Sequence, residues 1–393
     1  MATHLRTVEP TTDPLEDLSL PGWLYFDPEF FEAEKTAFLR SAPQVVCHEK
    51  EIAQPGEWRS LEYLGESIIV IRGDDGEVRA FSNVCRHRGS RLVDGDGGCA
   101  KVLTCPYHAW SYARDGRLVG VPHRQEYPGL QTDKLGLFPV ALENWRGFLF
   151  VTLEPGAPSV AEMMAPYEDE VAPYRFEDLE PIGRLTMRPR PLNWKTIADN
   201  YSDHLHIPVG HPGLTRLFAR NYKIEAQEHV DRMEGDLVEK VSENWSERAY
   251  QHLLPQADHL PATHRRKWLY YKLFPNVAFD IYPDQVDFMQ FLPVSSTETV
   301  IREISYALPG DDSREMRAVR YLNWRINRKV NAEDTELITR VQLGMQSPTY
   351  VAGPLGTSEV CLRSFSRRLR RMIPEARLDS APPAGWSRGA NAG

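Results

Sequence analysis

Four metal-binding side chains fall in two short loops, and this pattern constrains the fold more than any other feature of the 393-residue chain. The first loop holds Cys85 and His87, with one residue between them, and the second holds Cys105 and His108, with two residues between them. Seventeen residues separate the two pairs. Glycine and proline beside each pair predict tight turns, in which backbone amides can approach sulfur atoms. We therefore expect the two loops to meet around metal.

The order of the ligands distinguishes two kinds of metal site. Two thiolates and two imidazoles could hold a single tetrahedral zinc ion. Zinc sites, however, usually group the cysteines in one loop and the histidines in the other, whereas here each loop offers one of each. The interleaved order suits two metals better, one iron bound by both cysteines and the other by both histidines. That is the ligand set of a Rieske [2Fe–2S] centre.

A second group of metal-binding residues lies between positions 200 and 211. Apolar spacing over Trp194–Tyr201 predicts a helix, on which Asp203 and His206, three residues apart, would share a face. His211 follows five residues later, and the proline and glycine before it would break the helix, so that both imidazoles can converge on one ion. Two histidines and one carboxylate form the facial triad that holds Fe(II) with open coordination positions.

Both segments resemble those of the aromatic-ring-hydroxylating (Rieske non-haem iron) oxygenases, specifically their alpha, or catalytic, subunit. The stretch Cys105–Tyr112, running into Gly116-Arg117-Leu118, is similar to the family's Rieske motif. The run from Asn200 through Asp203 and His206 to His211 is similar to its catalytic motif. The resemblance implies that the cluster is bound by Cys85, His87, Cys105 and His108, and the mononuclear iron by His206 and His211.

The resemblance also implies roles for three acidic residues. Asp203 matches the acid that links a Rieske histidine of the neighbouring subunit to an iron-binding histidine, and so carries electrons between subunits. Asp334 resembles one member of an acidic doublet that opens a helix leading to a Gln-x-Gly sequence, and is expected to complete the iron site. Glu333 remains an alternative ligand. A purely structural explanation also stands, in which Asn331 caps the helix and the acids oppose its dipole.

The predicted fold class is α+β, in three parts. Residues 1–44 form an arm and a helix that packs with the catalytic domain, residues 45–155 a small all-β Rieske domain, and residues 156–393 the catalytic domain. By resemblance the last has a central antiparallel sheet flanked by helices, as in helix-grip (START-like) folds. Strands are expected at 277–282, 286–294 and 299–308 and separate helices at 316–326 and 338–345. An arginine-rich helix at 358–372 would present a solvated face or dock an acidic partner. Residues 1–20 would form a loose arm, and those after Pro374 would be disordered.

The family resemblance implies a terminal oxygenase that uses O2 and electrons from NAD(P)H. The electrons would arrive from a separate flavin and iron–sulfur reductase, with or without a ferredoxin, and the oxygenase would be a head-to-tail homotrimer. Its small organic substrate would be hydroxylated, dihydroxylated or oxidatively demethylated. Carnitine-type members carry the bridging acid between the two histidines, where this chain has Pro208, so an aromatic compound or aromatic acid is preferred to a quaternary ammonium compound. Five residues are possible pocket walls, although a core role is favoured for each: Phe279, Tyr282, Phe288, Met289 and Phe291.

Composition narrows the other classes of function. A net charge of −9 argues against nucleic acid or an anionic membrane as the main partner. Apolar runs are too short to cross a bilayer and no secretory signal is visible, so a cytoplasmic protein is expected. Two classes besides an oxygenase remain, a Rieske-type electron carrier and a zinc-stabilised binding module. If the protein were only an electron carrier, the aspartate and histidines between positions 200 and 211 would have no role.

Overall fold

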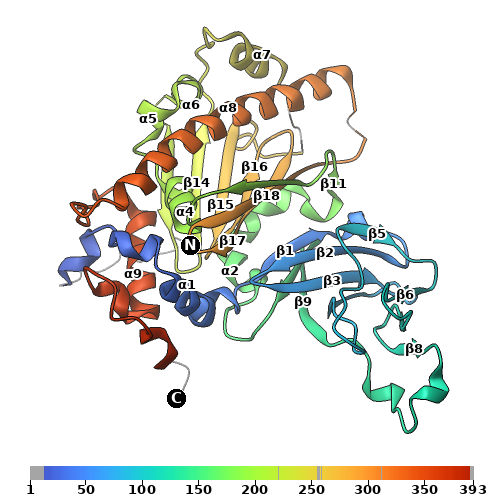
Figure 1. Ribbon diagram of the computed structural model, residues 1–393. Helices are drawn as coiled ribbons and strands as arrows, with labels where there is room; N and C mark the ends of the chain where they lie inside the picture. The colour runs from blue at the N-terminus through green and yellow to red at the C-terminus, as the bar shows by residue number, and fades with distance from the viewer. Residues whose placement is uncertain (1–12, 220, 255–256, 258, 311, 390–393) are drawn as a thin grey trace.

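The computed structural model describes residues 13–389, except 220, 255, 256, 258 and 311. Within these residues two large antiparallel sheets and one small sheet are joined by helices, which confirms the α+β class. Figure 1 shows the two large sheets side by side, with one long helix, α8, lying across the larger of them. In the described part of the chain, a helix with both the length and the apolar content of a bilayer-spanning segment is absent.

The sheets of the first half carry the two metal-binding loops. A seven-stranded sheet has the order β1-β10-β9-β4-β3-β2-β5, and a three-stranded sheet has the order β6-β7-β8. Strands β3 and β4 form an antiparallel hairpin, in which Ile71 pairs with Arg79. The strands are β1 (Gln44–His48), β2 (Glu57–Tyr63), β3 (Glu66–Arg72), β4 (Val78–Ser82), β5 (Asp96–Gly98), β6 (Val102–Thr104), β7 (Ser111–Ala113), β8 (Leu118–Gly120), β9 (Pro139–Trp145) and β10 (Phe148–Thr152).

An eight-stranded sheet dominates the second half. Its order is β11-β18-β17-β16-β15-β14-β13, with β12 also paired to β18. The three predicted strands are present to within two residues, as β16, β17 and β18. The strands are β11 (Glu180–Pro181), β12 (Thr186–Arg190), β13 (Tyr222–Ala226), β14 (Val230–Asp236), β15 (Lys267–Leu273), β16 (Val277–Ile281), β17 (Val286–Ser295) and β18 (Glu298–Ala307).

Helices cover this sheet and include one that the sequence divided in two. They are α1 (Pro28–Glu34), α2 (Val160–Met164), α3 (Glu168–Val171), α4 (Trp194–Ser202), α5 (Ile207–Gly210), α6 (Pro212–Phe218), α7 (Trp245–Leu253), α8 (Arg314–Met345) and α9 (Val360–Met372). A π-helical turn, Lys35–Leu39, extends α1. The prediction of separate helices at 316–326 and 338–345 was wrong, and so was the suggestion that Asn331 caps a helix, because α8 is continuous over 32 residues. Asn327, Asn331 and Asp334 share one face, so the polar stretch faces a cavity and does not mark a break.

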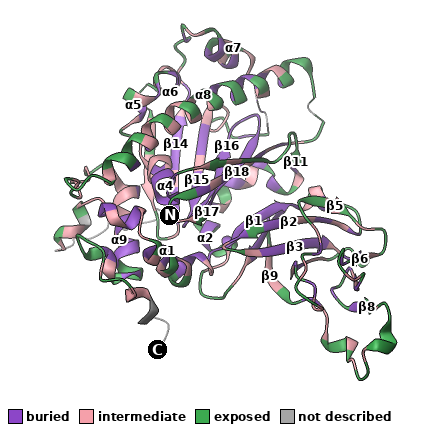
Figure 2. Ribbon diagram, in the orientation of Figure 1, coloured by how far each residue is buried: buried purple, intermediate pink, exposed green. Residues whose placement is uncertain are grey.

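Both faces of the large sheet are buried, but against different partners (Figure 2). On one face, Phe279 and Phe288 join Phe148 and Trp145 of the first half in a shared aromatic core. On the other face lie α4, α8 and α9, with Met289 and Phe291 beneath them. Successive residues of a strand point to opposite faces, so this alternation separates core residues from those that can line a site.

The ends of the described chain are ordered, contrary to prediction. Arg370, only 5% exposed, donates to the carbonyls of Leu15, Leu18 and Ser19 and so fixes the N-terminal arm on α9. Trp386 packs against Trp23 and Phe30, so residues 374–389 are also in place. At least one arginine of α9 therefore forms hydrogen bonds inside the protein and is not part of a solvated face. Residues 1–12 of the predicted loose arm and residues 390–393 of the segment predicted to be disordered lie outside the described part.

A buried ion pair joins the N-terminal region to the catalytic sheet's helices. Lys195 on α4 donates to Glu34 at the end of α1 across 2.7 Å, and both side chains are 0% exposed. The Trp194 indole donates to the same carboxylate at 3.2 Å. Removing one member of such a pair leaves a charge in an apolar interior.

We expect Glu34→Ala to lower the free energy of unfolding by about 3–5 kcal/mol, because Lys195 would keep its burial and lose its counter-ion. Urea denaturation followed by circular dichroism measures the change. The matched control is Glu32→Ala, which breaks an exposed pair with Lys35 on the same helix and should cost less than about 1 kcal/mol. Equal losses in the two variants would contradict the importance of burial.

Candidate metal centres

Cys85, His87, Cys105 and His108 lie on two loops with the same backbone geometry. In the first, the amide of Cys85 donates to the carbonyl of residue 90 and the amide of residue 89 to the Cys85 carbonyl, at 2.8 and 3.0 Å. In the second, Cys105 makes the equivalent bonds with residues 110 and 109 at the same two distances. Both loops also have a positive φ at the same place, 73° at Gly89 and 58° at Ala109. The two loops therefore share one backbone turn, although the histidine follows its cysteine by two positions in the first loop and by three in the second.

The four side chains suit a cluster with two kinds of ligand. Both cysteines are buried, and the rings of His87 and His108 are 4.6 Å apart between centroids. In the described chain the buried Nδ1 atoms of both histidines have no hydrogen-bond partner. Burial raises the pKa of the Cys85 thiol, whereas the amides of Tyr107 and His108 outweigh burial at Cys105 and lower its pKa. Unpartnered imidazole nitrogens and sulfurs that accept backbone amides fit a Rieske cluster.

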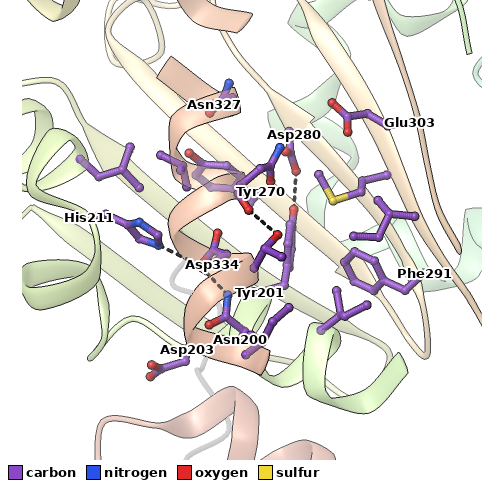
Figure 3. Close-up of a pocket in the computed structure, with 18 of the residues that line it drawn as sticks. Asn200, Tyr201, Asp203, His211, Tyr270, Asp280, Phe291, Glu303, Asn327 and Asp334 are labelled. Carbon is purple, nitrogen blue, oxygen red and sulfur yellow. Dashed lines mark hydrogen bonds and ion pairs between the residues drawn. The ribbon is translucent and has the colours of Figure 1, made fainter. Parts of the chain in front are cut away.

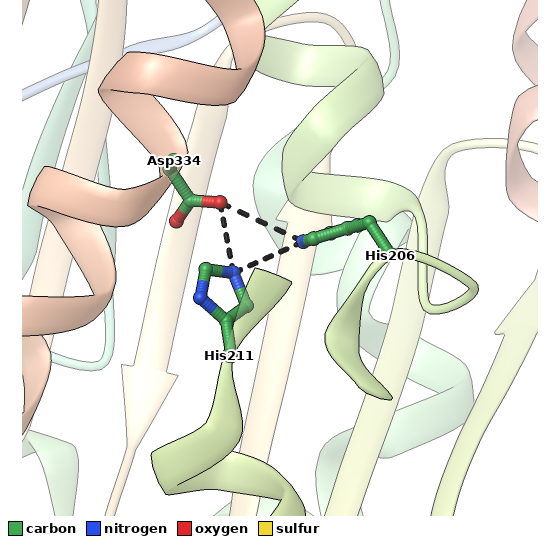
Figure 4. A group of neighbouring side chains, drawn as sticks. All are labelled: His206, His211 and Asp334. Carbon is green, nitrogen blue, oxygen red and sulfur yellow. Dashed lines mark hydrogen bonds and ion pairs between the residues drawn. The ribbon is translucent and has the colours of Figure 1, made fainter. Parts of the chain in front are cut away.

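The second group of residues converges on a single point (Figure 4). His206 Nε2 lies 3.1 Å from His211 Nε2, and Asp334 Oδ1 lies 2.9 Å from His211 Nε2 and 3.6 Å from His206 Nε2. The loop between α4 and α5 positions His206, the turn between α5 and α6 positions His211, and α8 supplies Asp334. Two imidazole nitrogens and one carboxylate oxygen on one side of a point match the donor set for Fe(II).

The helix break lies earlier than the sequence indicated. Helix α4 ends at Ser202, and Asp203 caps it in an extended conformation. Asp203 and His206 therefore meet across a turn and not along a helix: the Asp203 carboxylate accepts from the amides of Leu205 and His206. The predicted proline and glycine fall inside the short helix α5. The predicted pair of side chains is still in contact, because the carboxylate of Asp203 shapes the turn itself.

Two further carboxylates contact the outer nitrogens of the histidines. Asp203 Oδ2 lies 2.7 Å from His206 Nδ1, and Glu333 Oε2 lies 2.9 Å from His211 Nδ1. Asn200 donates to Asp334 Oδ1 at 2.7 Å. Burial opposes the charged form of His206, but Asp203 and Asp334 outweigh it and raise the pKa of that imidazole to about 9. Burial likewise opposes ionisation of Asp334, yet the two histidines hold the pKa of its carboxyl to about 2.

A pocket opens from this point towards the large sheet (Figure 3). Of the five predicted wall residues, Tyr282, Met289 and Phe291 line it, whereas Phe279 and Phe288 point to the opposite face of the sheet. The other lining groups were not predicted, among them Asp280, Asp287, Glu303 and the tyrosines at 201, 222 and 270. The missed signal was a single aspartate in each of the otherwise largely apolar strands β16 and β17.

Comparisons with known proteins identify a domain family for each half of the chain. A family model described as the ring-hydroxylating alpha subunit (catalytic domain) matches residues 176–375, and one for the Rieske [2Fe-2S] domain matches residues 42–139. A carnitine monooxygenase oxygenase subunit of Escherichia coli (strain K12) is 38% identical over 205 residues. That alignment covers 52% of this chain and 54% of the relative. The chain thus spans about half the length of that relative.

Two other similar proteins align over most of the chain. The alpha subunit of a 2-aminobenzenesulfonate 2,3-dioxygenase from Alcaligenes sp is 28% identical to this chain. The alignment covers 90% of this chain and 93% of that subunit. The solved structure of a quaternary ammonium Rieske monooxygenase superposes with a TM-score of 0.77 and 23% identity, covering 92% of this chain and 97% of its own. The superposition shows that the fold is shared.

Replacing Asp334 should separate the two metal sites. We expect Asp334→Ala to abolish mononuclear iron binding and to leave the visible spectrum of the cluster unchanged, because the partners of Asp334 among the described residues are Asn200, His206 and His211 and not the four cluster residues. Glu333→Gln, its matched control one residue away, should keep the iron with affinity reduced by about 10- to 100-fold, since it only orients His211. Iron analysis with electron paramagnetic resonance measures both. Loss of mononuclear iron in the Gln variant alone would make Glu333 the ligand.

The buried Asp280 predicts a pH-dependent stability. Burial raises the pKa of its carboxyl from 3.8 to about 7, so the folded protein holds this proton more tightly than the unfolded chain. Stability contributed by the protonated form is therefore lost as the pH rises towards 7. Asp280→Asn should gain stability relative to wild type between pH 5 and pH 8, as measured by urea denaturation. An equal difference in unfolding free energy between the variant and wild type at pH 5 and at pH 8 would contradict the raised pKa of Asp280.

Proposed function

Because the chain belongs to the family of Rieske ring-hydroxylating oxygenase alpha subunits, we propose that it is the terminal oxygenase of a multicomponent system. It would use O2 and electrons from a separate NAD(P)H-dependent reductase to oxidise a small organic substrate. The observation that carries this proposal is the convergence of His206, His211 and Asp334 beside a pocket, in a chain that also has two equivalent Cys–His loops.

The proposal assigns each group of residues a task. When bound, a Rieske cluster passes single electrons, and Fe(II) at a two-histidine, one-carboxylate site activates dioxygen at its open positions. Asp203 accepts the Nδ1 proton of His206 and so directs the lone pair of Nε2 to the metal position. Glu333 does the same for His211, and Asn200 fixes the orientation of the Asp334 carboxylate. We assign the cluster to residues 45–155, the iron to residues 156–393, and a packing role to residues 1–44.

A head-to-tail homotrimer is part of the proposal. Figure 1 draws the tip with β6 and β8 at the opposite side of the chain from α5, so electrons would have to cross a long distance within one subunit. Asp203 keeps 17% of its side chain exposed, behind His206. A cluster-binding imidazole of a neighbouring copy could therefore contact Asp203 from outside. We infer a cytoplasmic location from the ordinary soluble composition and the reducing chemistry that such a cluster requires.

The relatives divide between two substrate classes. Aromatic compounds are represented by the aminobenzenesulfonate dioxygenase, and quaternary ammonium compounds by the carnitine monooxygenase. Aromatic walls at Tyr282 and Phe291 serve either class, through stacking or through cation–π contacts. The proposed function needs only that one of these classes is oxidised with consumption of oxygen.

Spectroscopy and oxygen uptake test the proposal. Protein reconstituted anaerobically with iron and sulfide should show a reduced Rieske signal and separate ferrous iron, and should consume oxygen with reductase, NADH and a substrate of either class. Colourless protein that binds zinc would indicate a binding module. A cluster without mononuclear iron would indicate an electron carrier.

Asp203→Asn tests the route between subunits. We expect the amide to slow electron transfer to the mononuclear site by about 10- to 100-fold, because it no longer orients His206 as an anion does. Single-turnover oxidation of the reduced cluster, followed in the visible range, measures the rate. Iron content should be retained, and the cluster's potential should not change. An unchanged transfer rate would contradict the assigned role of Asp203.

A further inference from the structure

Two buried carboxylates face the substrate pocket from the large sheet. Asp280 on β16 and Asp287 on β17 are direct cross-strand partners, 7% and 6% exposed, and both line the pocket that contains Asp334 and His211. Cross-strand partners lie on the same face of a sheet, and like charges placed there destabilise it. Such a pair is unusual in a strand interior unless another group compensates for the charge.

Two arginines, Arg188 and Arg190, also line this pocket, but among the described residues neither of them pairs with Asp280 or Asp287. Asp280 accepts from the hydroxyls of Tyr201 and Tyr282, and Asp287 accepts from the Gln285 amide at 2.9 Å. Within the described residues neither carboxylate forms an ion pair. Glu303, on the next strand, pairs with Arg188, which leaves that guanidinium engaged. Burial raises the pKa of Asp287 well above its usual value, and Glu303 and Asp280 raise it further.

Aromatic rings surround the same space. Tyr201, Tyr222, Tyr270 and Tyr282 line the pocket with Phe291, and Figure 3 shows Tyr201 and Tyr270 between Asp280 and the metal-binding residues. Aromatic faces attract cations, and the attraction is greatest where water is excluded. Carboxylates without a counter-ion beside such rings are chemically suited to a cationic group and repel an anionic one.

We propose that Asp280 and Asp287, with the surrounding tyrosines, form a subsite for a positively charged nitrogen of the substrate. The substrate would be a tertiary amine or a quaternary ammonium compound, with its charge held at the sheet and its reacting carbon directed to Asp334 and His211. The oxidation of this substrate rests on the proposed function, whereas the binding of its cationic nitrogen does not. It replaces the preference for aromatic acids derived from the sequence, because a substrate carboxylate would face two buried acids.

Binding measured with charged and uncharged isosteres tests the subsite. Calorimetry under anaerobic conditions would compare choline with 3,3-dimethylbutan-1-ol, and phenyltrimethylammonium with tert-butylbenzene, on the iron-loaded protein; benzoate serves as the anionic probe. We expect at least one cation to bind about tenfold or more tightly than its uncharged isostere, and benzoate to bind weakly. If neither cation exceeds its isostere, or if benzoate binds more tightly than both, the subsite is refuted.

Carboxamide variants locate the charge. Asp280→Asn and Asp287→Asn should each weaken binding of the preferred cation by about tenfold or more, and should leave its isostere unchanged. The matched control is Asp284→Asn, a buried carboxylate between the same two strands that accepts from Tyr250 and does not line this pocket. Its cation affinity should equal that of wild type. Equal losses in all three variants would indicate a structural effect and overturn the proposal.

Separate measurements distinguish a folding defect, a failure of the proposed function and a failure of the subsite. Thermal unfolding should show both pocket variants at least as stable as wild type at pH 8, because each replaces a buried carboxyl group that has no ion-pair partner among the described residues with a neutral amide. Absence of the cluster or of mononuclear iron would end the proposed function, yet the comparison of isosteres would still decide the subsite. Oxygen uptake driven by an aromatic acid but by no cation would keep the function and overturn the subsite.

Discussion

The structure depends on bringing one carboxylate oxygen within 3.6 Å of two imidazole nitrogens that lie more than a hundred residues earlier in the chain. Such a contact needs rigid support on both sides. Helix α8 supplies it for Asp334 by running unbroken past the site, and the turn shaped by Asp203 supplies it for His206. Because Asp203 and Glu333 contact the outer nitrogens, each imidazole has one defined nitrogen left for a metal. The arrangement is thus preorganised by charges as well as by packing.

The candidate metal ligands could be predicted from sequence because their spacing is local. Cys85 and His87, or His206 and His211, stand within a few residues of each other, so their chemistry is visible in the printed chain. The choice between Glu333 and Asp334 could not be made that way, since it depends on which acid α8 turns towards the histidines. The division of α8 into two helices failed for a related reason. Polar residues in a helical pattern are expected to face solvent, and the sequence alone does not show that they face a buried polar site.

The pocket was harder to predict than the fold, because strand register decides which side chains reach it. Phe288 and Met289 are neighbours in sequence and equally apolar, but one enters the aromatic core shared with the first half and the other faces the pocket. The buried acids give the same lesson. Asp280 and Asp287 become a pair only when β16 and β17 are aligned. The large sheet thereby keeps its stabilising aromatic contacts on one face and its chemically active groups on the other.

The contacts of Arg370 have a consequence for how the protein can be shortened. Its guanidinium, almost entirely inside the molecule, relies on three backbone carbonyls from positions 15, 18 and 19. Deleting residues 15–19 would remove three hydrogen-bond acceptors from this buried guanidinium, and each lost hydrogen bond to a charged group destabilises the fold. Residues far from either metal centre therefore belong to the catalytic unit, and expression trimmed to the family-model boundaries would lose them.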